Sequence, residues 1–207
     1  STEQKNRRIS LIKAGSLAGV VLFIAAALQQ VGLQYPTAGK AGFITGLSVV
    51  IVPALSAILL RRLPEKPALL GVLLSTVGLA LLTLGRDLRP TIGDALVLGC
   101  AACFALHIVA VSRFAPRTDA LALTVVQVAA VAIFSAIATI LLGEWQPPPQ
   151  PVMGAAAFTG VLATALAFAV QNSVQSWTTA THTALIFATE PVFAGIFGFW
   201  FADERLT

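Results

Sequence analysis

The length of the uncharged stretches is the feature that most constrains how this chain of 207 residues folds. Between Glu144 and Glu190 there is no Asp, Glu, Lys or Arg, and other long uncharged runs occur along the chain. A helix needs about 20 mostly apolar residues to cross about 30 Å of hydrocarbon. Hydrophobic residues make up 57% of the chain and charged residues 11%. Because soluble domains carry about 25% charged residues, the sequence predicts an integral membrane protein.

Seven stretches have the length and composition of a membrane-spanning helix, so the sequence predicts an all-α, polytopic helix bundle. The run between Glu144 and Glu190 is too long for one span, and the polar segment 176–183 divides it into two. The predicted spans are residues 14–33, 37–60, 68–84, 91–112, 119–142, 152–176 and 183–201.

The distribution of basic residues predicts a cytoplasmic N-terminus. With that orientation nine Lys and Arg residues lie in inner loops and four in outer loops, as the positive-inside rule favours. The inner set is Lys5, Arg7, Arg8, Lys13, Arg61, Arg62, Lys66, Arg113 and Arg117; the outer set is Lys40, Arg86, Arg89 and Arg205. The net charge of +4 therefore needs no nucleic acid as partner. The predicted partners are a lipid bilayer and a small-molecule substrate.

An internal repeat emerges when the chain is compared with itself at an offset of 142 residues. Under the predicted topology the first copy runs outward and then inward, whereas the second runs inward and then outward, which makes the repeat inverted. Inverted repeats are common in secondary transporters, with the substrate site at the repeat interface. Chance similarity between apolar helices is the alternative. The aligned pairs include Gln29 with Gln171, Tyr35 with Trp177, Ala38 with Ala180, Ile44 with Ile186 and Val50 with Val192.

The motifs Leu-Gln-Gln-Val-Gly-Leu-Gln-Tyr at 28–35 and Ala-Leu-Ile-Phe-Ala-Thr-Glu-Pro-Val-Phe-Ala at 184–194 give the chain a family resemblance. It resembles the EamA-type transporters of the drug/metabolite transporter superfamily, which consist of two five-helix halves. Each half has a Pro-Val pair in its fourth helix and a Glu just after it. The second half of this chain keeps both features, at Glu190-Pro191-Val192 and Glu204, but the first half has Val49-Val50 and Arg62 in their place.

The resemblance implies that the seven spans are helices three to nine of ten, with two further helices before the chain and one after it. Residues 1–84 would then be the remainder of the first repeat, with three helices, and residues 85–207 a second repeat with four. The implied function is secondary transport of small metabolites, such as amino acids or drugs, by alternating access. The implied location is a bacterial inner membrane.

Glu190 is the only acidic residue deep inside a predicted span, where a charge costs about 2.5–3.5 kcal/mol on insertion scales. Counting about 1.5 Å per residue places His107, Gln127, Gln171 and Asn172 in the same layer, near the inner face. These groups predict a polar cavity in which Glu190 carries a proton or pairs with a cation and the amides orient the substrate. The alternative is that they only bond one another between helices, for about 0.6 kcal/mol per pair.

A second polar set falls in the outer part of the membrane, as an inverted repeat predicts: Gln29, Gln30, Thr45 and Ser48. Thr and Ser in membrane helices often bond their own backbone instead, which is the competing interpretation for the last two. Pro53 and Pro191 predict kinks that serve as hinges, because proline leaves a carbonyl without its helical donor.

Close helix packing is predicted at Gly15-xxx-Gly19, because small residues at this spacing let two backbones approach. Cys100, Cys103 and His107 share one helix face but are too few to hold a metal, so neither a metal nor a cofactor is predicted.

A seven-helix receptor or sensor is the competing class of function. Retinal is excluded because Lys5, Lys13, Lys40 and Lys66 are the only lysines and none lies in the last span. The chain is not expected to be an enzyme, since neither a Gly-x-Ser-x-Gly elbow nor a pair of intramembrane aspartates is present. Coupling to protons and assembly into a homo-oligomer stay open in this prediction.

Overall fold

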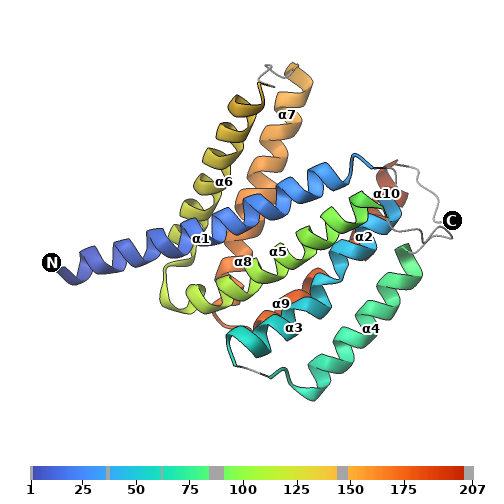
Figure 1. The fold of residues 1–207 in the computed structure, drawn as a ribbon, viewed down its shortest axis with the longest axis horizontal. Coiled ribbons are helices and arrows are strands. Elements are labelled where there is room, and N and C mark those ends of the chain that lie inside the picture. The colour runs from blue at the N-terminus through green and yellow to red at the C-terminus, as the bar shows by residue number, and fades with distance from the viewer. Residues whose placement is uncertain (1, 36–37, 62, 84–90, 144–148, 203–207) are drawn as a thin grey trace. The chain divides into compact units, whose positions relative to one another are not determined.

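The computed structural model describes residues 2–35, 38–61, 63–83, 91–143 and 149–202, and every regular element in these ranges is a helix (Figure 1). The prediction of an all-α protein is confirmed. In order the elements are α1 (Thr2–Gly32), α2 (Ala38–Gly46), α3 (Ser48–Leu59), α4 (Lys66–Thr83), α5 (Ile92–Phe114), the 3-10 helix η1 (Ala115–Arg117), α6 (Ala120–Leu142), α7 (Gln150–Phe158), the π-helix η2 (Thr159–Leu166), α8 (Ala167–Gln175), α9 (Ala180–Phe187) and α10 (Glu190–Ala202).

Five helical stretches in the described ranges are long and apolar enough to cross a membrane: Glu3–Gly32, Ala41–Leu59, Ile92–Arg117, Ala120–Leu142 and Gln150–Gln175. The shorter apolar helix Lys66–Leu81 lies in the third predicted span. The seventh predicted span holds two short helices, α9 and α10, rather than one continuous helix. A multi-pass membrane protein is therefore confirmed, and the predicted boundary at 176–183 corresponds to the end of α8 and the start of α9.

Several helix ends follow directly from the sequence. Asp119 caps α6, since its carboxylate accepts the N–H of Ala122 at 2.7 Å and satisfies a donor that the first turn leaves open. Gly143 ends the same helix in the left-handed region (φ 68°), which glycine adopts without a steric penalty. Thr179 caps α9 by accepting the N–H of His182 at 3.3 Å. These caps set the helix register, and with it the positions of the polar residues described below.

The chain divides into two compact units, each described by itself. The α6 unit comprises residues 1–24 and 110–178, and the α3 unit comprises residues 25–109 and 179–207. Both predicted repeats contribute residues to both units. Helices α1 and α5 continue from one unit into the other along the chain.

In the α6 unit, α6 packs against α8 and η2 (Figure 1). Its core is made of small and aliphatic side chains: Ala14, Ala18, Val111, Ala115 and Leu123. Gly15 and Gly19 bring α1 against α6, because a Cβ at Gly19 would lie 2.6 Å from the carbonyl oxygen of Gln127 and 2.6 Å from Ala130 Cβ. A Cβ at Gly15 would lie equally close to Val126. The predicted close packing at Gly15-xxx-Gly19 is confirmed.

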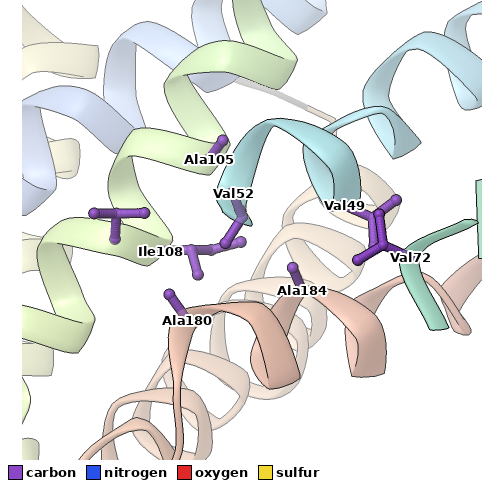
Figure 2. Close-up of a cluster of buried hydrophobic side chains, with 8 residues drawn as sticks. Val49, Val52, Val72, Ala105, Ile108, Ala180 and Ala184 are labelled. Atoms are coloured by element: carbon purple, nitrogen blue, oxygen red, sulfur yellow. The ribbon is translucent and has the colours of Figure 1, made fainter. Parts of the chain in front are cut away.

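The α3 unit has its own core, in which side chains of α3, α4, α5 and α9 come together (Figure 2). Every side chain in this cluster is Val, Ala or Ile, so the helices approach closely without long side chains between them. The cluster consists of Val49, Val52, Val72, Ala105, Ile108, Val109, Ala180 and Ala184.

The offset of 142 residues found in the sequence also relates two stretches of backbone, here called the first copy (residues 29–59) and the second copy (residues 171–201). Between α2 and α3 the helix has a local irregularity at Leu47, and Thr189, between α9 and α10, is the equivalent position; each is here called an interruption. Leu47 keeps right-handed helical dihedral angles and its N–H bonds the carbonyl of Phe43 at 3.1 Å, so Ala41–Leu59 remains one helical stretch. Hydrogen bonds repeat as well. The matching N–H to O pairs are Gln34 to Val31 with Ser176 to Ser173, Tyr35 to Gly32 with Trp177 to Val174, Leu47 to Ile44 with Thr189 to Ile186, Val50 to Leu47 with Val192 to Thr189, and Ile51 to Leu47 with Phe193 to Thr189.

Candidate functional site

Polar side chains are concentrated inside the α6 unit, between helices that are otherwise apolar. Gln127 and Asn172 are fully buried, and Thr124, Gln171 and Gln175 are at most 8% exposed. Burying an amide or hydroxyl is costly unless it finds a hydrogen-bond partner. The contacts of these residues therefore show what the cluster is built to hold.

Asn172 on α8 bonds across to Thr124 on α6. The Thr124 hydroxyl donates its proton to the carbonyl of Ala120 at 2.8 Å and also lies 3.5 Å from the carbonyl of Phe168. A hydroxyl has one proton, so toward Asn172 the Thr124 oxygen can only accept. The amide nitrogen of Asn172 donates to it at 2.8 Å. This chain of bonds fixes which end of the Asn172 amide faces Thr124.

A second chain of bonds lies beside the first and joins α8 to α5. The amide nitrogen of Gln171 donates to the carbonyl oxygen of Gln175 at 2.9 Å, and the amide nitrogen of Gln175 donates to the hydroxyl of Ser112 at 3.0 Å. Both ends of the Gln175 amide are thus engaged. Together the two chains tie the end of α8 to the end of α5 and the start of α6.

Two buried amide atoms of this unit make no hydrogen bond in the described part of the chain: the carbonyl oxygen of Asn172 and the amide nitrogen of Gln127, a residue that has another interaction. An unmet buried acceptor costs about 1–3 kcal/mol, so native structures hold few of them. Neither α6 nor the stretch from α7 to α8 contains Asp, Glu, Lys or Arg, whereas η1, which contacts α8, holds Arg117, and Asp119 caps α6.

In the α3 unit the predicted residues are more dispersed. His107 on α5 is buried, at 1% exposure. Glu190 is the first residue of α10 and is exposed, and Ser48, its equivalent in the first copy, is the first residue of α3 and half-buried. The remaining predicted residues of this unit are Gln29, which is half-buried, Gln30, which is exposed, and Thr45 on α2, which is half-buried.

The two prolines predicted as hinges differ in their place within the helix. Pro53 lies inside α3 and is buried, whereas Pro191 occupies the first turn of α10, directly after the interruption at Thr189. A proline in the first turn costs no helical hydrogen bond, because the first amides of a helix have no partner inside it. The interruption in the first copy falls at Leu47, six positions before Pro53.

The structure brings some of the predicted residues together. Gln171 and Asn172 belong to the cluster in the α6 unit, and Gln127 is buried in the same unit. His107 and Glu190 belong to the α3 unit, so the single polar layer predicted from the sequence stays a prediction. Arg62 and Glu204, which stand at matching places in the family pattern, lie outside the described residues.

Three members of the cluster were not predicted: Ser112, Thr124 and Gln175. For two of them, helical spacing in the sequence could have indicated a place in the cluster. Gln175 follows Gln171 by four residues, and Thr124 precedes Gln127 by three, so each shares a helix face with a predicted residue. Ser112 lies at the cytoplasmic end of its predicted span, and nothing in its sequence context distinguishes it.

Cys100 is buried and Cys103 half-buried, and both are free thiols. Within the described ranges no group of three or more His, Cys, Asp or Glu residues is placed to hold a metal ion.

Comparison with known proteins gives two results. The profile of the EamA-like transporter family matches residues 1–84 and 91–207. A protein of Archaeoglobus fulgidus named "Uncharacterized transporter" is 33% identical over 195 residues, which are 94% of this chain and 63% of that protein. The chain thus spans less than two thirds of the length of this relative.

Proposed function

The chain belongs to the EamA-like transporter family, and we propose that it moves small metabolites, such as amino acids or drugs, across the membrane by alternating access. The family and the apolar helices support a membrane transporter. The class of substrate, the mechanism and any coupling ion are the proposed part. Residues 1–84 and 85–207 are proposed to derive from the two family repeats.

The observation that carries the proposal is the matched pair of interrupted helices. In transporters with inverted repeats the substrate site lies at the interface of the repeats, and the two halves move against each other around it. Here the chain is interrupted at equivalent positions in both copies, with the same three hydrogen bonds around Leu47 and Thr189. Each interruption is followed at once by a polar residue, Ser48 or Glu190, that begins the next helix. This supports two equivalent points at which the copies bend during transport.

Proton coupling is proposed to involve Glu190. It is the only acidic residue within α9 and α10, and it begins the helix that follows the interruption. A carboxyl group there can bind a proton when it faces one side and release it when it faces the other. If Glu190 served only to pack against neighbouring helices, it would not need to bind and release a proton.

A bacterial inner membrane is the proposed location, because membrane proteins with several α-helical spans are inserted there, whereas outer membranes hold barrels. The proposed partners are the lipid bilayer and a small-molecule substrate.

The direct test is counterflow with the full-length protein in proteoliposomes. Vesicles are loaded with one member of a metabolite panel, and uptake of the same labelled compound is measured with and without a pH gradient. The expected result is transient accumulation of one class of compound above the level in protein-free vesicles. A protein that binds a compound without accelerating its flux would instead be a receptor.

A further inference from the structure

We propose that the carbonyl oxygen of Asn172 is a binding site for the transported solute, and that it accepts an N–H or O–H group from a small solute. This rests on the proposed transport function. The site lies in the α6 unit, where Asn172 is fully buried beside Thr124.

The first argument is the fixed orientation of the amide. Because the Thr124 hydroxyl gives its proton to Ala120, only the amide nitrogen of Asn172 can face it. The Asn172 oxygen is thereby held on the opposite side, and among the described residues it meets no donor. With the amide turned over, the Thr124 hydroxyl would have to give up its bond to Ala120 in order to donate to Asn172. The observed orientation keeps both bonds and leaves the Asn172 oxygen as an acceptor.

The second argument is the chemistry of the side chains around the amide. The groups that bond one another in this cluster are amides and hydroxyls. A neutral amide oxygen among them is satisfied by a single N–H or O–H donor.

The third argument comes from the repeat. Gln30 is the equivalent of Asn172 in the first copy, and it is exposed while Asn172 is enclosed. Both stand three residues or fewer before the end of their helix, α1 or α8. Equivalent polar side chains of the two copies therefore differ in burial, since one is uncovered and the other is enclosed by neighbouring helices. In an alternating-access cycle, opening the second copy would expose the Asn172 oxygen to solute.

The test uses four zwitterionic probes of equal charge: L-serine, L-alanine and the N,N,N-trimethyl derivative of each. Serine offers N–H and O–H donors, alanine only N–H, trimethylserine only O–H, and trimethylalanine neither. Binding to the full-length protein is measured by ligand-induced thermal stabilisation in nanodiscs. The comparison between the derivatives separates an ammonium donor from a hydroxyl donor.

Asn172→Leu removes the acceptor and keeps similar volume. We expect the Kd of the donor-bearing probe to rise about tenfold, equivalent to about 1.4 kcal/mol, and the response to trimethylalanine to stay the same. Gln150→Leu, an amide-to-leucine change at an exposed position of α7, is the matched control and should leave binding unchanged. Thr124→Val leaves Asn172 in place but frees its amide to rotate, so it should weaken donor-bearing probes by a smaller factor, and Thr124→Ser should restore binding.

Two results would overturn the assignment: no stabilisation of the unmodified protein by any donor-bearing probe, or equal weakening of all four probes in both Asn172→Leu and Thr124→Val. The second result would make the cluster purely structural. The outcome is separable from that of the transport proposal. If the protein transports solute but the Asn172→Leu variant keeps the same selectivity among the probes, only this inference is wrong. If the probes bind selectively but no flux is measured, only the transport proposal is wrong.

Discussion

The first copy (29–59) and the second copy (171–201) share a backbone but differ in chemistry. Both have the same turn after a long helix and the same interruption, with matching hydrogen bonds. Yet Gln29 and Gln30 are half-buried and exposed, whereas Gln171 and Asn172 are enclosed in a network that reaches α5 and α6. The backbone hydrogen bonds at equivalent positions are thus alike in the two copies, while the side chains there differ in type and burial.

The acid is the sharpest difference between the copies, because Glu190 stands where the first copy has Ser48. Two identical copies could exchange roles without any change in energy. Under the proposed cycle, only the second copy has a carboxyl group at this position that can bind a proton on one side and release it on the other. The difference between the copies therefore predicts a division of labour, in which the second copy handles coupling.

Removing the acid from the second copy should have the largest effect. Glu190→Gln keeps size and hydrogen-bonding capacity but cannot release a proton, so accumulation driven by a pH gradient should be lost while counterflow without a gradient persists. Uptake into proteoliposomes at several external pH values measures this. Glu65→Gln, at an exposed acid between α3 and α4, is the control. Unchanged pH dependence together with a lower melting temperature would assign Glu190 to packing.

Two glycine-to-alanine substitutions compare the close packing of α1 on α6 with the exposed stretch around η2. The offset of 142 residues relates these two stretches of the chain. Gly19→Ala should destabilise the protein by about 1–3 kcal/mol, because its methyl group would meet the backbone carbonyl of Gln127, which cannot move aside cheaply. Gly160→Ala has no atom within 4 Å of its new methyl group and should be neutral or stabilising. Equilibrium unfolding in bicelles distinguishes the two. Equal effects would mean that α1 does not pack closely on α6.

Leucine substitutions of the equivalent glutamines Gln171 and Gln29 should have the smallest effects on stability, and the loss should be larger for Gln171. Gln171→Leu breaks the bond to Gln175 and should cost about 0.6 kcal/mol, the average for hydrogen bonds between side chains in membrane helices. Gln29 lies outside such a network in the described structure, so Gln29→Leu should lower the free energy of unfolding by less. The same unfolding assay applies to both variants. The reverse order would indicate that the first copy holds the more important polar contact.

Hydropathy along the sequence located the apolar stretches, because the bilayer imposes one length scale on every span. It did not predict how helices divide within them, since the seventh predicted span holds both α9 and α10. Close packing at Gly19 was also predictable, since glycine at that spacing has one common purpose in membrane helices. The interruptions at Leu47 and Thr189 were not predicted. Proline is the only strong local signal for a break, and here Pro53 lies inside α3 while the break falls six residues earlier.

The polar cluster was predictable in part. Gln171 and Asn172 stood out because buried amides in a membrane need partners, whereas Thr124 and Ser112 did not, because such hydroxyls usually bond their own helix. Thr124 does both: it donates to Ala120 and accepts from Asn172. Only the packing of α8 against α6 determines that second contact, and no local sequence pattern encodes it.

The central claim is that the two copies are inserted in opposite directions, and the sidedness of one equivalent pair tests it most directly. Gln34 and Ser176 occupy the same hydrogen-bonded turn in the two copies. Each is changed to cysteine in a background lacking Cys100 and Cys103, and a membrane-impermeant maleimide is applied to vesicles of known orientation. We predict that Gln34→Cys reacts from the outer side and Ser176→Cys from the cytoplasmic side. Labelling of both from the same side would contradict the inverted repeat, and with it the alternating access built on it.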